Sequence, residues 1–540
     1  MDRPTVTVRE GTLQGTTLQS VLGVNYLAFK GIPYAQPPIG PLRFKEPQPP
    51  LKWSGVRDAS EHGGDVAMQY EFDPSKPAGV IGSEDCLYLN VYSRSIDHKR
   101  PVMVFIHGGG FVGGSGNECI YRQDYLMSTP IVLVYVNYRL GPFGFFKLGD
   151  KEAPGNQGLK DAILALKWIR ENIGAFGGDP DNVTIFGNSA GSLICHLFTL
   201  VPATKGLFHK AILQSGSIFS ARNLLKERNI LNGFRIASLL GLDSDDPVKI
   251  LEFLRTVPAE RFVELEHRIL SKQEKTIFGL RPYIPVYDGE HSDDPVIPLP
   301  LSKLLENDAD IPIIVGHTSN ESIETFAGRL NDGEFYKFYD ENIEEIVKNY
   351  LLLREPSKFS EIMSAVRQFY LKNKAISQEN AWNPVNLMTD IARINLNRKM
   401  IDLRNEHATA PTYAYNFSYQ GNEPTFYSYD KDSRPLRGVA HADELAYMFY
   451  IPYMKKDKPF PQEGTKDRHV LERLIRMWYN FALTGDPTSM KDDRYVTTTW
   501  PPSERNNLFY LDIGEELVLK SDKESPSRSI YEKYSDICLF

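Results

Sequence analysis

The chain has 540 residues, of which 41% are hydrophobic and 24% charged, an ordinary globular composition that excludes collagen-like and disordered chains. Its 61 basic and 69 acidic residues give a net charge of −8, so nothing favours binding to the phosphate backbone of nucleic acids. No apolar run approaches the roughly 20 residues that a membrane-spanning helix needs. We therefore expect a soluble protein with no nucleic-acid partner and no membrane span.

The N-terminus and the cysteines indicate the compartment. Residues 1–8 alternate like a strand and lack the apolar core of a secretory signal. The four cysteines are widely spaced and form no Cys-x-x-Cys pair, which argues against a disulfide framework or a zinc site: Cys86, Cys119, Cys195 and Cys538. We expect one domain over residues 1–540, located in the cytoplasm as a monomer or homodimer.

Several segments predict secondary structure in chain order. The first 30 residues are typical of a small antiparallel sheet, with Gly11 and Gly15 at turns. A helix is predicted after Gly155-Asn156 up to Gly174, because apolar residues recur at steps of four and three. Another is predicted from Val470 to Leu483. Five nearly continuous apolar runs are typical of strands buried on both faces of a parallel sheet: Val102 to Ile106, Ile131 to Tyr135, Val183 to Phe186, Ala211 to Leu213 and Ile311 to Val315.

This alternation predicts an α/β fold in which helices flank a large, mostly parallel, twisted sheet. Two stretches do not follow the strand–helix alternation: residues 221–310 and 323–410 are charged, helix-prone and interrupted by proline-containing loops. We expect these two stretches to be helical insertions that form a cap or the walls of a substrate pocket.

The motif Gly-Asn-Ser-Ala-Gly at 187–191 follows the predicted strand at 183–186 and precedes a stretch that can form a helix. A serine at such a sharp turn projects its hydroxyl, and the flanking glycines avoid collisions with neighbouring elements. A Gly-x-Ser-x-Gly pattern is expected by chance about 0.2 times in a chain of this length, so the motif alone is moderate evidence. The predicted strand directly before it strengthens the assignment. We predict that Ser189 is a nucleophile.

A serine nucleophile needs a base, and the oxyanion that it creates needs backbone N–H donors. The predicted strand at 102–106 runs into His-Gly-Gly-Gly-Phe at 107–111, where bare backbone amides can turn towards an oxyanion. We assign Gly109, Gly110 and Ala190 to this oxyanion hole. A triple glycine on its own is also compatible with a simple flexible turn.

The base and the acid are sought in chain order, because the nucleophile precedes the acid and the acid precedes the histidine in such folds. Among the eleven histidines, this order excludes His62, His98 and His107. His441 lies in a loop-like break, and Glu321 follows the predicted strand at 311–315, at the sheet edge where α/β sites form. Position alone leaves both assignments open.

With these residues in view, the chain resembles the type-B carboxylesterase and cholinesterase-like family of α/β-hydrolases, and it looks most like the insect carboxylesterases. The resemblance covers nearly the whole chain. It rests on motifs in a common order: Phe29 to Ala35, Pro41 to Phe44, Ser83 to Tyr92, the loop at 107–111, Asn137 to Arg139, Pro154 to Asp161 and the serine turn.

The resemblance implies an α/β-hydrolase fold with Glu321 as the acid and His441 as the base. It also implies two structural ion pairs, Arg43 with Glu84 and Arg139 with Asp161, which lie outside the site. The implied reaction is hydrolysis of carboxylic esters, xenobiotic or endogenous and including detoxification, through an acyl-enzyme. Small-molecule esters are then substrates, organophosphates are inhibitors, and no metal or organic cofactor is needed.

Three departures from the family pattern are informative. The family disulfide of Cys86 cannot form, because its partner's place reads Ala67-Met68-Gln69. No tryptophan occurs between Ala67 and Cys86 to bind a quaternary ammonium, which disfavours choline esters. Asn188 stands where the family commonly has glutamate. Juvenile-hormone esterase, pheromone-degrading esterase and lipase remain alternatives, as does a non-catalytic binding or adhesion module of the same fold.

Overall fold

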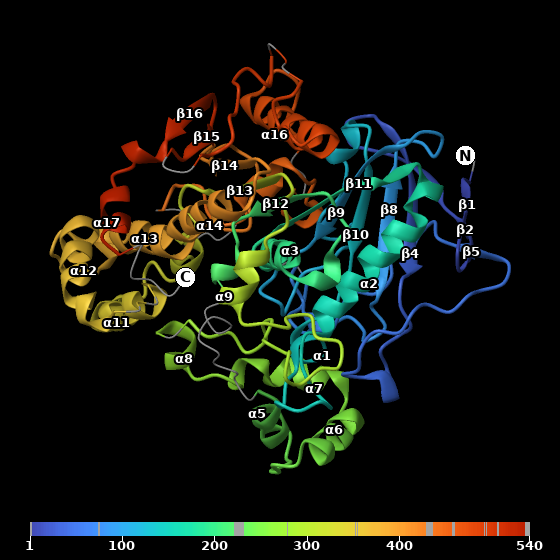
Figure 1. The fold of residues 1–540 in the computed structure, drawn as a ribbon, viewed down its shortest axis with the longest axis horizontal. Helices are drawn as coiled ribbons and strands as arrows, with labels where there is room; N and C mark the ends of the chain where they lie inside the picture. The colour runs from blue at the N-terminus through green and yellow to red at the C-terminus, as the bar shows by residue number, and fades with distance from the viewer. Residues whose placement is uncertain are drawn as a thin grey trace.

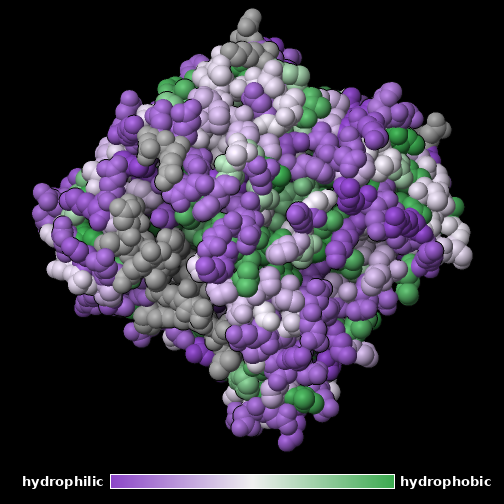
Figure 2. All heavy atoms as spheres, in the orientation of Figure 1, coloured by the Kyte–Doolittle hydropathy of each residue, from purple (hydrophilic) through white to green (hydrophobic). Residues whose placement is uncertain are grey.

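The computed structural model describes residues 3–534 except 74–75, 221–231, 278, 352, 354, 428–435, 456–458, 491, 493 and 505–506. Its centre is an 11-stranded sheet with the strand order β16-β15-β14-β13-β12-β11-β9-β10-β8-β4-β3, with helices on both sides (Figure 1). The face shown in Figure 2 is largely hydrophilic, with hydrophobic side chains in a central area and in scattered spots nearer the edge. None of the helices in the described ranges is long and apolar enough to cross a lipid bilayer.

The middle of this sheet is parallel, and its edges are antiparallel. The parallel strands are β10 (Val132–Val136), β9 (Arg100–Ile106), β11 (Gly178–Asn188), β12 (Lys210–Gln214), β13 (Ile313–Thr318), β14 (Thr412–Phe417) and β15 (Phe509–Ile513). The antiparallel edge strands are β8 (Tyr88–Ser93), β4 (Asn25–Pro33) and β3 (Thr16–Gln19) on one side and β16 (Leu517–Ser521) on the other. The predicted mostly parallel sheet is confirmed, and the five predicted strand runs are β9 to β13.

Alternate side chains of the strands enter two different cores. In β9, Val102, Val104 and Ile106 pack in one core, and Met103 and Phe105 pack in the other. Successive side chains of a strand point to opposite faces, so a strand covered on both sides needs apolar residues throughout. This is why the parallel strands read as continuous apolar runs.

Two strand predictions differ in detail from the structure. β13 begins at Ile313 rather than Ile311, and the intervening Pro312 has no N–H to donate to a ladder. The small N-terminal sheet contains β1 (Thr5–Val8) and β2 (Gly11–Gln14), which pair antiparallel as expected. Its third strand, β5 (Val56–Asp58), is parallel to β2, so this sheet is mixed. The other strands of the first 30 residues, β3 and β4, belong to the large sheet.

The two predicted helices are α2 (Gln157–Asn172) and α16 (Lys466–Thr484). Before α2, Asn156 is left-handed with a φ of 67°. After α16, Gly485 is left-handed with a φ of 87°, which is the usual glycine stop. The helix α3 (Ala190–Leu200) begins directly after Ser189, and α1 (Gly141–Phe145) contacts the glycine loop, because Gly141 N donates to the Phe111 carbonyl at 2.7 Å.

The stretches at 221–310 and 323–410 are helical insertions, as expected, although residues 221–231 lie outside the described residues. The first contains α5 (Asn232–Leu239), α6 (Pro247–Thr256), α7 (Ala259–Leu265), α8 (Lys272–Thr276) and α9 (Leu301–Leu304). The second contains α10 (Ile323–Phe326), α11 (Gly333–Leu351), α12 (Phe359–Val366), α13 (Trp382–Thr389) and α14 (Asn395–His407). The helices α5 to α8 gather at the bottom of Figure 1, and α11 to α13 gather at its left with α17 (Arg528–Glu532). Their role as pocket walls stays a prediction.

The Arg139–Asp161 pair predicts a large effect on stability. The Asp161 side chain is fully buried, and its two oxygens accept from Nε and Nη2 of Arg139 at 2.8 and 2.7 Å. Asp161→Asn leaves the buried guanidinium without its counter-charge, so we expect a loss of about 3–5 kcal/mol of unfolding free energy in urea titrations. Glu171→Gln, which removes an exposed partner of Arg9, is the control and changes stability by less than about 0.5 kcal/mol. Equal effects of the two substitutions would contradict this account.

Candidate active site

The site lies where the order of the strands in the sheet reverses, between β9 and β11. β9 and β11 are neighbours although β10 follows β9 in the chain, so the connections leave their carboxyl ends in opposite directions. Open α/β sheets form their ligand crevice at such a point. The glycine loop at 107–111 follows β9, and Ser189 follows β11. The predicted oxyanion hole and the predicted nucleophile therefore meet at the same edge.

Ser189 occupies a strained turn between β11 and α3. Its φ is 57° and its ψ is −119°, a conformation that side-chain-bearing residues rarely adopt, and it is partly exposed. A Cβ atom at Gly187 would lie 2.4 Å from the Ile106 carbonyl oxygen, and one at Gly191 would lie 1.9 Å from the same oxygen. The turn can pass this close to β9 only because both positions are glycine.

The glycine loop lies against this turn. A Cβ atom at Gly108 would be 3.2 Å from the Ser189 Cβ. Within the described part of the chain, the amides of Gly109 and Gly110 donate to no protein acceptor. The amide of Ala190, the first residue of α3, has no acceptor within its helix. These three amides are therefore free to donate to a ligand, and their role as an oxyanion hole stays a prediction.

His441 and Glu321 are in direct contact. His441 Nδ1 lies 2.5 Å from Glu321 Oε2, and Thr318 N donates to Glu321 Oε1 at 2.8 Å. Both side chains are buried, with 5% and 1% exposure. Because a carboxylate accepts, His441 carries its proton on Nδ1 and leaves Nε2 unprotonated. The structure thus brings together the acid and the base proposed from sequence position.

Opposite charges determine the ionisation of this pair. Burial on its own would raise the pKa of Glu321, but the charge and hydrogen bond of His441 and the guanidinium of Arg393 lower it to about 2. Burial on its own would lower the pKa of His441, but the carboxylates of Glu324 and Glu321 outweigh it and raise that pKa above its usual value. Glu321 is therefore a stable anion beside a basic imidazole.

The link between Ser189 and this pair is indirect. Within the described residues, the Ser189 hydroxyl makes no hydrogen bond, and such catalytic contacts are often formed only with a bound substrate. Glu444, three residues after His441, accepts from Asn188 Nδ2 and from Gln214 Nε2, both at 3.3 Å. These bonds tie the serine turn to the histidine loop.

Sequence reasoning missed three residues of this network: Arg393, Glu324 and Glu444. Arg393 Nε lies 3.6 Å from Glu321 Oε2, and its Nη2 lies 3.4 Å from Glu324. No spacing rule connects Arg393 to the acid across the chain. Glu444 lies in the loop that singled out His441, and burial raises its pKa to about 7. A carboxyl group three residues after the candidate base was the sequence signal that could have identified Glu444.

The two ion pairs implied by the family resemblance are present in the structure. Arg43 Nε donates to Glu84 at 2.6 Å, and Arg139 pairs with Asp161, so both implied ion pairs are confirmed. Cys86 is a free buried thiol. His107 stacks on Tyr138 at 4.5 Å, and burial lowers its pKa to about 4. No group of three or more His, Cys, Asp or Glu in the described ranges is placed to hold a metal ion.

The close approach at Ile106 predicts a sharp effect of a small substitution. In Gly191→Ala the new methyl group meets the Ile106 carbonyl, so we expect a loss of about 3 kcal/mol or more in thermal unfolding. Gly174→Ala is the matched control, because a Cβ there meets nothing within 4 Å. A Gly191→Ala protein as stable as Gly174→Ala would show that the turn has room for a side chain.

Comparisons with known proteins identify the family of the chain. The profile of the Carboxylesterase family matches residues 2–530. Esterase FE4 of Myzus persicae is 34% identical over 97% of this chain and 91% of its own length. Juvenile hormone esterase of Tribolium castaneum is 34% identical over 90% of this chain and 84% of its own. The crystal structure of juvenile hormone esterase from Manduca sexta, with OTFP covalently attached, superimposes with a TM-score of 0.84 at 29% identity and covers 99% of both chains. The chain is a carboxylic ester hydrolase and belongs to the carboxylesterase family.

Proposed function

We propose that this chain hydrolyses carboxylic esters through an acyl-enzyme on Ser189, with His441 as the base and Glu321 as the acid. The observation that carries the proposal is the buried 2.5 Å contact of His441 Nδ1 with Glu321, at the same sheet edge as the strained serine. A non-catalytic module of this fold predicts a broken set of three residues, whereas here all three are present.

Each residue has one task in this reaction. His441 takes the Ser189 proton as the serine oxygen attacks the ester carbonyl, and it returns that proton to the leaving alcohol. It then activates water, which releases the acid from the acyl-enzyme. Glu321 holds the tautomer of His441 and stabilises its cation. The amides of Gly109, Gly110 and Ala190 stabilise the oxyanion, an effect of about 3–4 kcal/mol for each donor.

Small-molecule esters are the proposed substrates, and the acyl preference is set by the pocket. Juvenile hormone esters are a second candidate, favoured by the similarity to the juvenile hormone esterases of Tribolium castaneum and Manduca sexta. Rates with 4-nitrophenyl acetate, butyrate and octanoate, compared with a juvenile hormone ester, distinguish a short-acyl esterase from a lipase-like pocket or a hormone esterase.

Ser189→Ala tests the nucleophile. We expect kcat for 4-nitrophenyl butyrate to fall by a factor on the order of 10⁴ or more, because the residual rate comes from the oxyanion hole and binding alone. The pre-steady-state burst of 4-nitrophenol should disappear as well. Ser192→Ala is the matched control, since Ser192 lies on α3 and donates to the Gly216 carbonyl at 2.5 Å.

The same experiment has an independent chemical readout. An organophosphate mimics the tetrahedral intermediate, so mass spectrometry of treated protein should find the phosphoryl adduct on Ser189. The proposal would be contradicted by a folded wild-type protein that hydrolyses the ester no faster than Ser189→Ala and whose Ser189 stays unmodified.

The pH profile tests the His441–Glu321 pair. The base must be neutral, so kcat falls as the pH drops through the raised pKa of His441. Glu321→Gln removes an anion from beside the imidazole, so this acid limb moves to lower pH and kcat falls by roughly 10³–10⁴-fold. Glu324→Gln also moves the limb to lower pH, but it keeps the hydrogen bond and changes the plateau by less than about tenfold. An acid limb that stays fixed in both variants would exclude His441 as the base.

A further inference from the structure

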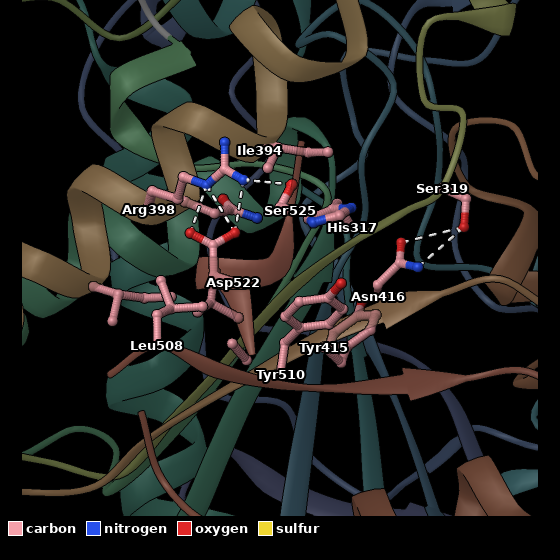
Figure 3. Close-up of a pocket in the computed structure, with 14 residues that line it drawn as sticks. His317, Ser319, Ile394, Arg398, Tyr415, Asn416, Leu508, Tyr510, Asp522 and Ser525 are labelled. Atoms are coloured by element: carbon pink, nitrogen blue, oxygen red, sulfur yellow. Dashed lines mark hydrogen bonds and ion pairs between the residues drawn. The ribbon is translucent and has the colours of Figure 1, made fainter. Parts of the chain in front are cut away.

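A cavity of about 160 Å³ lies between the sheet and α14. None of the residues proposed to carry the ester chemistry lines it. An apolar cavity of roughly 150 Å³ is large enough to bind benzene, so a ring-sized molecule fits here. The wall comes from the faces of β13, β14 and β15, from α14, and from the segment after β16 (Figure 3). Its polar side chains include His317, Asn397, Arg398, Asp522 and Ser525.

The two charged side chains of the wall, Arg398 and Asp522, form an ion pair with each other. Arg398 Nε donates to both oxygens of Asp522 at 3.0 and 2.9 Å, and both side chains are buried. Its Nη1 donates to Asn395 at 2.6 Å and its Nη2 to Ser525 at 3.1 Å, so every nitrogen of the guanidinium is engaged. Burial lowers the pKa of His317, which is therefore neutral. A charged ligand would find no free counter-charge here and would lose its hydration.

Two polar atoms of the wall define what a neutral ligand must offer. His317 Nδ1 lies 3.0 Å from the Thr318 carbonyl, so in the neutral ring it carries the proton and Nε2 is left as an acceptor. The Asn397 side chain is 7% exposed, and its Nδ2 has no hydrogen-bond partner among the described residues. A hydroxyl group that donates to His317 Nε2 and accepts from Asn397 Nδ2 would pair both atoms. The carbon body of the ligand would lie on Ile394, Ile401 and Leu508.

A second pocket of about 370 Å³ borders the cavity, because Ser319 and Ser525 line both. Two of its walls are π-helical turns, at Arg367–Leu371 and Asp390–Ile394. π-helical turns are rare in proteins and occur frequently at functional sites. Two such turns line this one pocket, so we infer that the region beside the cavity is a functional part of the fold.

Two elements connect the cavity to the catalytic acid. His317 and Ser319 line the cavity, and Thr318 between them donates to Glu321 Oε1 at 2.8 Å. The π-helical turn at Asp390–Ile394 has Ile394 in the cavity wall and Arg393 Nε 3.6 Å from Glu321 Oε2. A molecule that displaces either element also moves a partner of Glu321.

We propose that this cavity is a second ligand site, which takes a neutral alcohol or phenol and whose occupation alters the surroundings of Glu321. Ester hydrolysis releases an alcohol, so the reaction of the family produces molecules of this class. The hydroxyl lies between His317 and Asn397, and the hydrocarbon part lies against α14.

Crystals of the whole protein soaked in 4-bromophenol give the location. We expect an anomalous bromine peak between α14 and β13, within van der Waals distance of Ile401. Bromine found only beside Ser189 or on the outer surface would overturn the proposal.

Binding in solution is measured with 4-fluorophenol by ¹⁹F NMR. Ile401→Trp fills the cavity and should weaken the binding by about tenfold or more, whereas His407→Trp places the same side chain on an exposed turn of α14 and should leave it unchanged. Asn397→Leu keeps the volume but removes the unpartnered donor, and we expect about a tenfold loss. It serves as the test if Ile401→Trp does not fold. Equal affinity in all the folded variants would contradict the site.

Coupling to the acid has its own readout. With ethyl butyrate at saturation and acid release followed in a pH-stat, 4-fluorophenol should change kcat at least about twofold in the wild type and in His407→Trp. Ile401→Trp should show no such change. An effect that persists in Ile401→Trp arises at the Ser189 site, and an absent effect in the wild type excludes coupling.

Discussion

The Ile106 carbonyl oxygen, at the end of β9, sets how closely the serine turn and the glycine loop approach each other. Side chains at Gly187 or Gly191 would collide with it, and Gly108 faces the Ser189 Cβ across the same narrow gap. Because the backbones touch without intervening side chains, the amides of the loop lie near the serine. The strained φ of Ser189 is held in place by this contact, since β11 and α3 fix the turn on both sides.

The electrostatics of the site follow from burial. Glu321 stays charged in a buried position only because His441, Arg393 and the Thr318 amide surround it. The same carboxylate keeps His441 basic although burial opposes its protonation. Glu444 lies in an equally buried place, but its partners are the neutral amides of Asn188 and Gln214, so its pKa rises towards 7. Two buried glutamates near one histidine thus differ in ionisation because of their neighbours.

The parts of the molecule that could be predicted from the sequence are those governed by local rules. Continuous apolar runs identified β9 to β13, because strands covered on both faces leave no polar side. The serine turn was visible because its sterics demand glycine at fixed offsets. The small N-terminal sheet was predicted less well, because β5 is contributed by residues far from β1 and β2 and pairs parallel to β2. His441 and Glu321 needed the family resemblance in addition to position.

The part that could not be predicted is the contribution of the helical insertions to the acid. Arg393 touches Glu321 from a π-helical turn, and a single inserted residue in a helix changes which side chains face inwards without leaving a periodic signal. The cavity beside α14 is likewise formed by segments spread from β13 to the residues after β16. Because Arg393 and Ile394 of the cavity wall belong to one turn, that turn both contacts Glu321 and borders the proposed ligand site. A structural element that stabilises Glu321 is then also a place at which its environment can be changed.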